Sequence, residues 1–383
     1  MTTATETTAR TGSAAAASPQ PSANPNKALW EKGDFTRIAR TMRESGEALV
    51  RSIGVAPGER VLDLGCGDGT TALPAAQLGA EVLGVDIASN LVRAGQARAR
   101  AAGLANLRFQ EGDACALGEL EDASFDLSVS IFGAMFAPRP IDVARELVRV
   151  TRRGGRIVMG NWIPDDPTLV AQVLKTSAAY TPPPPAGFVS PMAWGVEAQV
   201  IERFAAAGIS AERVAFTRDV FTFRFAGTPA AFVDEFANWY GPTMNAFEAA
   251  GRNGKAGALR DALVALFERQ NQSARPDATV IPATFLRVTV SCWSTTRRVP
   301  ALRPAPRSLA PRGPDSSEPP PRSRSTARSR RWVRTRRSIS TRCSAGTSGL
   351  RVGPTARGVD VGSNPTRFPA DGANARSIRR SGS

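Results

Sequence analysis

Three glycines and the acid before them have the residue types and spacing to hold a ligand. The glycines stand at every second position directly after the apolar run 61–64, and they are Gly65, Gly67 and Gly69. An apolar run that ends in glycines predicts a buried parallel strand, a tight loop and then a helix. Because glycine tolerates positive φ and a close backbone approach, this loop is suited to wrap a bound molecule.

Other polar residues fall at the ends of further predicted strands. Asp63 lies in the first strand, Asp86 closes the second, Asp113 follows the third, and Ser130 lies near the end of the fourth. Ligands of doubly wound sheets bind beyond the carboxyl ends of the parallel strands. We therefore expect these four residues at one edge of a sheet.

Two ligand classes compete for such a loop. Dinucleotide-binding folds use G-x-G-x-x-G and place a pyrophosphate at the helix N-terminus. Here the spacing is G-x-G-x-G, and Asp63 would repel a pyrophosphate but suit a cationic or amine-bearing ligand. Asp86 is placed to accept hydrogen bonds from a ribose diol.

The elements around the loop alternate between strand and helix. Strands are predicted over 60–64, 80–86, 107–110, 125–132 and 155–162, with helices between them. This alternation predicts a right-handed, parallel, doubly wound α/β sheet. Helical periodicity precedes it over 27–53; after it come an alternating aromatic strand over 214–225, a long helical stretch over 229–270 and a last strand over 284–290.

The pattern D-x-G-x-G-x-G, followed by an acid about 20 residues later, resembles the class I S-adenosylmethionine-dependent methyltransferases. The resemblance covers about 28–162, and TFLRVTV at 284–290 is similar to the antiparallel last strand of that family. The chain looks most like the ubiquinone and menaquinone biosynthesis type. The resemblance implies a Rossmann-like, mostly parallel seven-stranded sheet with an antiparallel last strand and a helical cap.

The resemblance also assigns roles at the cofactor, S-adenosyl-L-methionine. The glycine loop would wrap its methionine part, Asp63 would orient it, Asp86 would hold the ribose hydroxyls, and Asp113 with Ala114 would contact the adenine. The predicted cofactor-binding residues are Asp63, Gly65, Cys66, Gly67, Asp86, Ile87, Asp113, Ala114 and Ser130.

Each of these residues also has an ordinary structural interpretation. The glycines could serve only as turn residues, and Asp86 or Asp113 could cap a helix. Ser130 could be a packing residue. Cys66 is interpreted as a small loop residue rather than a nucleophile, because no histidine or nearby lysine could activate it.

The region 163–275 is the predicted substrate cap. Its aromatic and methionine side chains suit a hydrophobic or aromatic acceptor, or else form the core of a helical insertion; they are Phe188, Met192, Trp194, Trp239, Tyr240, Met244 and Phe247. Since the chain has no histidine, a base would be a carboxylate, a tyrosine or a water, and Tyr180, Tyr240 and Asp234 stay open as candidates. Trp30 and Phe35 could close over the cofactor or pack in the core.

Charge divides the chain unevenly. The formal net charge is +15, but residues 291–383 hold about 20 arginines and no lysine, which leaves about 29 basic and 30 acidic residues before them. Composition predicts disorder for 1–26 and for this tail. We interpret 291–383 as translated in a shifted frame, because the composition changes abruptly and GSNPT at 362–366 matches a transfer RNA T-arm read as codons. The methyltransferase domain is thus predicted over 27–290, with its cofactor-binding core over 54–162.

These observations favour a methyltransferase that acts on a small, hydrophobic or aromatic molecule. The alternatives are a nicotinamide-dependent oxidoreductase, which the glycine spacing disfavours, and a non-catalytic nucleic-acid-binding protein that uses the arginine-rich tail. A nucleic-acid acceptor is disfavoured by the neutral body. Four cysteines without CxxC spacing and the lack of histidine predict no metal site and favour a cytoplasmic location. No apolar run is long enough to span a membrane.

Overall fold

The computed structural model describes residue 24 and residues 26–292. Most of the predicted disordered segment 1–26, and the arginine-rich tail from residue 293 onward, lie outside these residues. Among the described helices, none is long and apolar enough to cross a membrane.

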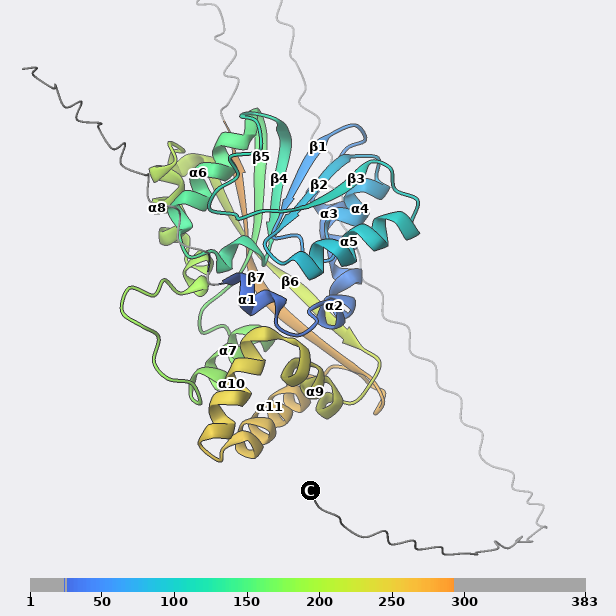
Figure 1. The fold of residues 1–383 in the computed structure, drawn as a ribbon, viewed down its shortest axis with the longest axis vertical. Coiled ribbons are helices and arrows are strands. Elements are labelled where there is room, and N and C mark those ends of the chain that lie inside the picture. Colours follow the sequence, from blue (N-terminus) through green and yellow to red (C-terminus); the bar gives the residue numbers. More distant parts are fainter. Residues whose placement is uncertain (1–23, 25, 293–383) are drawn as a thin grey trace, which may run out of the picture. The chain divides into compact units, whose positions relative to one another are not determined.

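Seven strands form one sheet in the order β3-β2-β1-β4-β5-β7-β6 (Figure 1). Their bounds are β1 Arg60–Leu64, β2 Glu81–Asp86, β3 Leu107–Glu111, β4 Phe125–Ile131, β5 Thr151–Trp162, β6 Val214–Phe225 and β7 Thr279–Ser291. β1 to β5 pair in parallel, whereas β7 runs antiparallel to both β5 and β6. The predicted fold, a mostly parallel Rossmann-like sheet with an antiparallel last strand, is confirmed.

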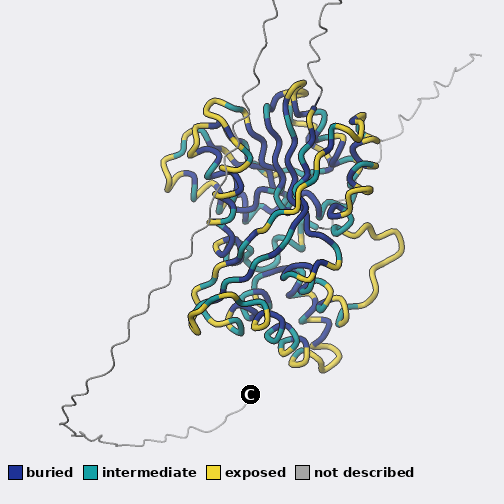
Figure 2. The backbone as a smooth tube through the Cα atoms, turned by 180° about the vertical axis from the view of Figure 1, so that it is seen from behind, coloured by how far each residue is buried: buried dark blue, intermediate teal, exposed yellow. Residues whose placement is uncertain are grey.

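Helices cover both faces of the parallel half of the sheet. The short apolar side chains of α3 (Arg43–Ile53), α4 (Ala72–Gln77) and α5 (Ser89–Ala101) pack with Val61, Val82 and Val158 on one face. On the other face, α6 (Pro140–Val150) and α8 (Glu197–Ala206) pack with Leu62, Leu64 and Ile157. Successive strand residues therefore point to opposite faces and both are covered, as expected for a buried parallel sheet. The dark blue strands in Figure 2 show this burial.

A second group of helices packs beside the long ends of β6 and β7. It consists of α7 (Leu169–Ala178), α9 (Pro229–Trp239), α10 (Gly241–Arg252) and α11 (Ala256–Gln270), which contact one another (Figure 1). The predicted long helical stretch over 229–270 consists of three helices. Tyr240 is extended at φ −97° and ψ 106°, and the second break falls at Asn253 and Gly254, where Gly254 has φ +66°.

The last strand begins five residues earlier than expected. β7 includes Pro282, which lacks the N–H that a central strand donates. β5 ends where Trp162 pairs with Phe285, so the first part of β7 has β6 on one side only. Proline is tolerated there because that part of the strand is an edge.

The N-terminal periodic region is also broken into pieces. It forms α1 (Asn26–Glu31), α2 (Thr36–Ala39), the 3-10 turn η1 (Arg40–Met42) and then α3. Gly33, at φ +78°, interrupts the helix, and a Cβ there would lie 2.8 Å from the Trp239 carbonyl oxygen. Three more 3-10 turns complete the elements: η2 Ala134–Phe136, η3 Pro191–Gly195 and η4 Ala211–Arg213.

Candidate active site

The glycine loop is held against the ends of two neighbouring strands. The backbone N–H groups of Gly65 and Cys66 both donate to the Val85 carbonyl of β2, at 2.7 and 3.1 Å. Gly65 has φ +69°, and a Cβ on it would lie 2.6 Å from the Cα of Gly133, which follows β4. Both the φ angle and this close approach require glycine at position 65.

Asp68 anchors the loop from behind, a role that the motif alone did not suggest. Its carboxylate is 1% exposed and forms ion pairs with Arg43 of α3 at 2.9 Å and with Arg98 of α5 at 3.2 Å. Both arginines are only partly buried, so each keeps some contact with water. The loop is thereby tied to two helices of one face.

Asp86 is oriented by the loop and by its own helix. One carboxylate oxygen accepts from the Gly67 N–H at 2.8 Å and the other from the Ala88 N–H at 2.9 Å. Each carboxylate oxygen has a second lone pair, so two further hydrogen bonds can still be accepted. Burial raises the pKa of Asp86 above its ordinary value.

Asp63 lies beside Asp86 and is more isolated. It is 1% exposed, and its Oδ2 has no hydrogen-bond partner among the described residues. Burial and then the charge of Asp86 raise the pKa of Asp63 to about 7. An unpaired buried carboxylate is costly unless a cation or a donor completes it.

Residues before and within α1 reach across to the loops that follow β2, β3 and β4. Asn24 donates to Asp113 Oδ1 at 3.1 Å, and Asn26 donates to the Phe136 carbonyl oxygen. Glu31 accepts from the N–H and the hydroxyl of Ser89, at 3.1 and 2.8 Å, and its pKa is lowered by these bonds. Lys27 pairs with Glu111. Asn24 and Asn26, which composition placed in a disordered segment, are thus fixed beside the site.

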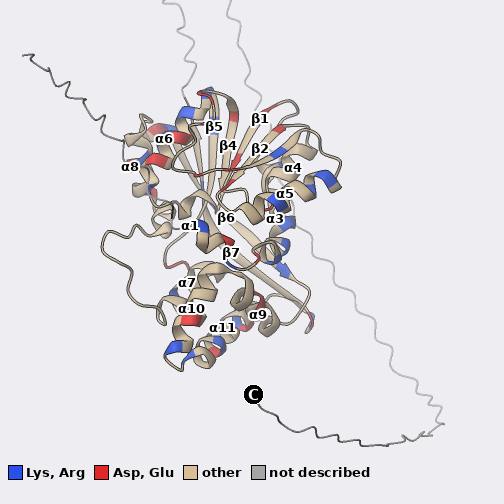
Figure 3. Cartoon of the chain, in the orientation of Figure 1, with Lys and Arg blue, Asp and Glu red and all other residues tan. Residues whose placement is uncertain are grey.

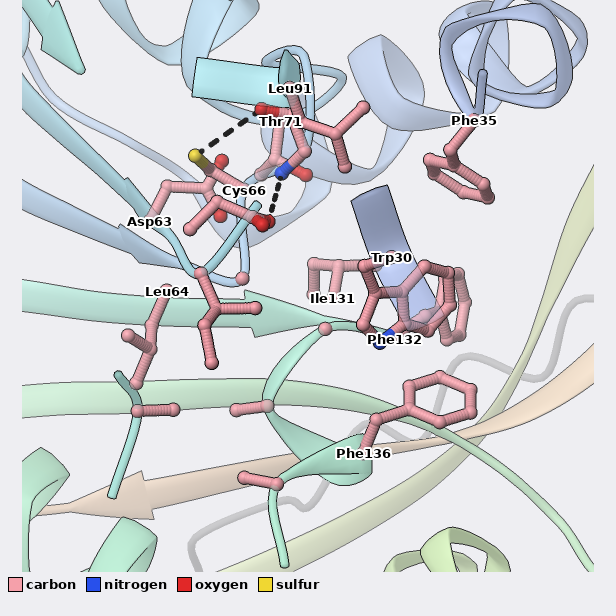
Figure 4. Close-up of a pocket in the computed structure, with 18 of the residues that line it drawn as sticks. Trp30, Phe35, Asp63, Leu64, Cys66, Thr71, Leu91, Ile131, Phe132 and Phe136 are labelled. Atoms are coloured by element: carbon pink, nitrogen blue, oxygen red, sulfur yellow. Dashed lines mark hydrogen bonds between the residues drawn. The ribbon is translucent and has the colours of Figure 1, made fainter. Parts of the chain in front are cut away.

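The predicted residues lie together. Of the nine, all but Ser130 line one cavity at the carboxyl edge of β1, β2 and β3. Figure 4 shows its two sides: Asp63, Cys66 and Thr71 come from the strand and loop at β1, while Trp30, Phe132 and Phe136 form an aromatic wall. Cys66 is buried, its thiol pKa is raised by burial, and its Sγ contacts only the neighbouring Gly67 carbonyl among the bonds described.

Ser130 is buried beneath the cavity. Its hydroxyl donates to the Leu64 carbonyl at 2.7 Å and accepts from the Ala134 N–H at 3.0 Å. Both bonds hold the end of β1 against η2. In this structure the Ser130 side chain therefore supports the wall of the cavity and does not face its interior.

The turn after β4 contributes wall residues that the sequence analysis did not single out. Phe132 has φ +61°, which is strained for a bulky side chain. Its ring stacks on the Trp162 ring, with 3.7 Å between the ring centroids and an angle of 9° between the ring planes. The only sequence signal for it is its place after a parallel strand, at the edge where ligands bind.

A second chamber adjoins the first and shares with it the side chains of Trp30, Phe35, Met42, Phe132 and Phe136. Its other lining residues come from α2, β5, α7, β6, α9 and the corner after α9. They are Ile38, Trp162, Val170, Val173, Leu174, Phe223, Phe236 and Tyr240. None of these lining side chains is charged. This chamber is apolar, in contrast to the acid-bearing first cavity.

The three open candidates for a base fall in different places. Tyr240 lines the apolar chamber. Asp234 faces Arg260 in a two-bond ion pair at 2.9 Å near the surface. Tyr180 follows α7 and is not among the lining residues of either cavity.

This sheet order, with a glycine loop and successive strand-end acids at one edge, defines a Rossmann-like protein of the class I methyltransferase type. A family model described as a methyltransferase domain matches residues 62–159. Protein Rv1403c of Mycobacterium tuberculosis is 37% identical over 246 residues, which are 63% of this chain and 86% of that protein.

Two further similarities are more limited. Demethylmenaquinone methyltransferase of Renibacterium salmoninarum is 33% identical over 114 residues, 30% of this chain and 46% of that enzyme. The crystal structure of YcgJ from Bacillus subtilis matches this chain with 21% sequence identity and a TM-score of 0.43. The match covers 65% of this chain and 98% of the YcgJ chain. The chain belongs to the S-adenosylmethionine-dependent methyltransferases, and its cofactor is S-adenosyl-L-methionine.

The residues of the first cavity fit this cofactor. The unpartnered Asp63 Oδ2 can accept from a positively charged amino group, and the remaining lone pairs of Asp86 can accept from a diol. A Cβ on Gly67 would meet nothing closer than the Phe35 ring at 3.9 Å, so the loop leaves open space on that side. A dinucleotide is a poorer fit because the buried Asp63 beside the glycine loop would repel its pyrophosphate.

Proposed function

We propose that the protein transfers a methyl group to a small, uncharged, hydrophobic or aromatic molecule that binds at the aromatic wall with part of it in the apolar chamber. The observation that carries this proposal is the shared aromatic wall between the two cavities. A donor in the first cavity and an acceptor in the second would meet where Trp30, Phe132 and Phe136 line both. A chamber without charged lining favours an uncharged acceptor, since a buried charge would have no partner.

For the donor, we assign roles to the residues of the first cavity. Asp63 holds the amino group, Asp86 holds the ribose hydroxyls, and Asp113 with Ala114 and Ile87 bounds the adenine. Gly65 and Gly67 bring the loop backbone close to the methionine part, with Cys66 as a small side chain between them. Ser130 acts as a positioning residue through its bonds to Leu64 and Ala134.

When bound, S-adenosylmethionine supplies a methyl group on a sulfonium, activated for in-line transfer to a nucleophile. The chain contributes position and the exclusion of water, which together can supply several kcal/mol. The aromatic wall is fixed by the stack of Phe132 on Trp162 and by the edge contact of Trp30 with Phe136 at 4.9 Å. No carboxylate or lysine lines the acceptor chamber, so we assign no general base to it.

Charge supports a small molecule over a nucleic acid as the acceptor. Basic and acidic residues are mixed along α6 and across α9 to α11, whereas α5 has arginines without acids (Figure 3). Many of the described arginines are engaged in ion pairs, among them Arg37 with Glu235 and Arg156 with Glu59. The near-neutral charge balance of residues 1–290 gives this part of the chain no overall attraction to a phosphate backbone.

Two measurements test the proposal. Calorimetric titration with S-adenosylhomocysteine should give a dissociation constant in the micromolar range. A screen with methyl-labelled cofactor, using matched neutral and carboxylated aromatic compounds, should find label only on the neutral members. Transfer to the carboxylated members alone, or to RNA, would contradict the proposed acceptor class while leaving the methyltransferase assignment intact.

A further inference from the structure

The apolar chamber includes one buried tyrosine, Tyr240, whose hydroxyl forms no described hydrogen bond. Tyr240 is 6% exposed and lines the chamber, and no described residue forms a hydrogen bond with its hydroxyl. It is also the only hydroxyl among the described residues that line this chamber. A buried tyrosine hydroxyl is usually hydrogen-bonded, so this group lacks a partner that a bound molecule could supply.

The rest of Tyr240 is firmly placed. Its N–H donates to the Phe236 carbonyl at 3.2 Å, and its carbonyl accepts from the Met244 N–H at 2.9 Å. Its ring contacts Trp30 and Phe35 at 6.0 Å between centroids. These backbone bonds and ring contacts place the tyrosine side chain at the chamber without a ligand.

The corner that carries Tyr240 is locked to the segment that covers the donor cavity. A Cβ on Gly241 would lie 2.3 Å from the Leu29 carbonyl oxygen of α1, so α10 begins in direct backbone contact with α1. The hydroxyl is therefore held in a fixed relation to Trp30, which lines both cavities. A hydrogen bond at this point would orient an acceptor relative to the donor.

We infer that the Tyr240 hydroxyl is a substrate-positioning group that donates a hydrogen bond to an oxygen atom of a neutral, ring-bearing methyl acceptor. The inference rests on the proposed function and narrows it: the acceptor carries a hydroxyl or carbonyl oxygen, and its ring packs among the aromatic side chains. Pure hydrocarbons would leave the hydroxyl unpaired and bind less well for their size.

Tyr240 acts here as a donor and not as a base. Burial raises the pKa of its hydroxyl well above the ordinary value, so the proton stays on the oxygen at neutral pH. The hydrogen bond is between neutral groups, and its loss is expected to weaken binding by a factor of about 3 to 10.

The chain offers a matched control because it has only two tyrosines, Tyr180 and Tyr240. Tyr240→Phe removes one oxygen and keeps the ring contacts, and Tyr180→Phe makes the same change outside both chambers. The probes are p-cresol and p-xylene, which differ by a hydroxyl in place of a methyl group. Each is titrated into the protein with S-adenosylhomocysteine filling the donor cavity.

The readout is the NMR signal of tyrosine labelled with carbon-13 at Cζ, which gives one signal for each of the two tyrosines. We expect p-cresol to shift the Tyr240 signal more than p-xylene does, and to bind Tyr240→Phe about fivefold more weakly than wild type. The affinity for p-xylene should not fall in Tyr240→Phe, and neither affinity should change in Tyr180→Phe. An unchanged S-adenosylhomocysteine affinity checks the fold of both variants.

Two outcomes overturn separate parts of the account. If p-cresol and p-xylene bind wild type but lose equal affinity in Tyr240→Phe, or none, the hydroxyl is not a positioning group and the proposed acceptor chamber still stands. If neither probe moves the Tyr240 signal of wild type, the chamber itself does not take neutral aromatic molecules. The proposed function then fails together with the inference.

Discussion

The first cavity, which we propose as the donor cavity, and the apolar chamber, which we propose as the acceptor chamber, are built in opposite ways. The donor cavity is lined mainly by short loops directly after β1 to β4, and among its polar groups is Asp63, whose Oδ2 has no partner in the described chain. The acceptor chamber is assembled from α2, α7, α9, β5 and β6, and it is lined almost wholly by apolar side chains. The first has groups for specific polar recognition, and the second selects mainly by shape and by the absence of charge.

This difference teaches where each kind of specificity resides. Groups that bind a polar cofactor must be placed accurately, and strand ends place them with short loops. An apolar pocket tolerates exchange of its side chains at similar volume, so the helices that supply them can vary in sequence and connection. The wall of Trp30, Phe35, Phe132 and Phe136 is where the two meet.

The largest loss of donor affinity is expected from Gly65→Ala, a change in the donor cavity alone. The new Cβ would lie 2.6 Å from the Gly133 backbone at φ +69°, so the loop must move. We expect affinity for S-adenosylhomocysteine, measured by calorimetry, to fall more than about 100-fold. Gly58→Ala is the control, because Gly58 has φ +75° but open space around it. Equal losses in the two variants would show that strain alone, and not the close approach, explains the effect.

Asp86→Asn should produce the next largest loss. The amide keeps the side-chain size but loses the charge and part of the capacity to accept hydrogen bonds from a diol. We expect S-adenosylhomocysteine to bind about 30-fold more weakly, corresponding to about 2 kcal/mol. Asp122→Asn, on a 77% exposed side chain, should change nothing. Wild-type affinity in Asp86→Asn would remove Asp86 from the proposed donor site.

Val173→Thr tests the other region at nearly constant volume. The added hydroxyl lies in the apolar chamber, and we expect methyl transfer to a neutral acceptor to fall about tenfold while donor affinity is unchanged. Val143→Thr on α6 is the matched control, since Val143 is equally buried but lines neither cavity. A loss of donor affinity in Val173→Thr would mean that the two regions are not separable.

The smallest expected change in donor affinity comes from a pH dependence that arises in the donor cavity, and the same titration also affects stability. Because the pKa of Asp63 is raised to about 7, the carboxyl holds a proton in the folded protein that the unfolded chain releases near pH 4. Stability without ligand should therefore fall as pH rises from about 4 to about 7, by at most about 1.4 kcal/mol per pH unit.

The ionisation of Asp63 should also make the donor bind more tightly as the pH rises toward about 7. In the proposed site ionised Asp63 pairs with the amino group of the ligand. Affinity for S-adenosylhomocysteine should therefore rise several-fold from pH 5.5 to 7, below the range in which an α-amino group loses its proton. Asp63→Asn should flatten both profiles in calorimetric and thermal unfolding measurements. A variant that retains the wild-type slopes would contradict the assignment of the titrating group.

The sequence was most informative where function depends on backbone geometry. The glycine spacing and the acids at 63, 86 and 113 predicted the strand-end cavity, because each feature is local to one strand and the loop after it. The fold class followed from the alternation of strands and helices. Ser130 could not be distinguished by the same logic, since being near a strand end does not say whether a hydroxyl faces the cavity or the Leu64 carbonyl.

The acceptor chamber was less predictable because its parts meet only in three dimensions. Nothing local to Phe132 or Trp162 announces a ring stack between the ends of β4 and β5. Likewise, Asp68 becomes an anchor only because α3 and α5 bring Arg43 and Arg98 to it. The helical period over 229–270 predicted the helices but not the break at Tyr240, which turns that side chain into the chamber.

A crystal structure of the protein with S-adenosylhomocysteine tests the division into two regions most directly. We predict the amino group at Asp63, the ribose hydroxyls at Asp86, the adenine beside Asp113 and Ala114, and the sulfur facing the aromatic wall toward the apolar chamber. A sulfur atom directed away from Trp30 and Phe132, or a ribose held elsewhere than at Asp86, would contradict the account.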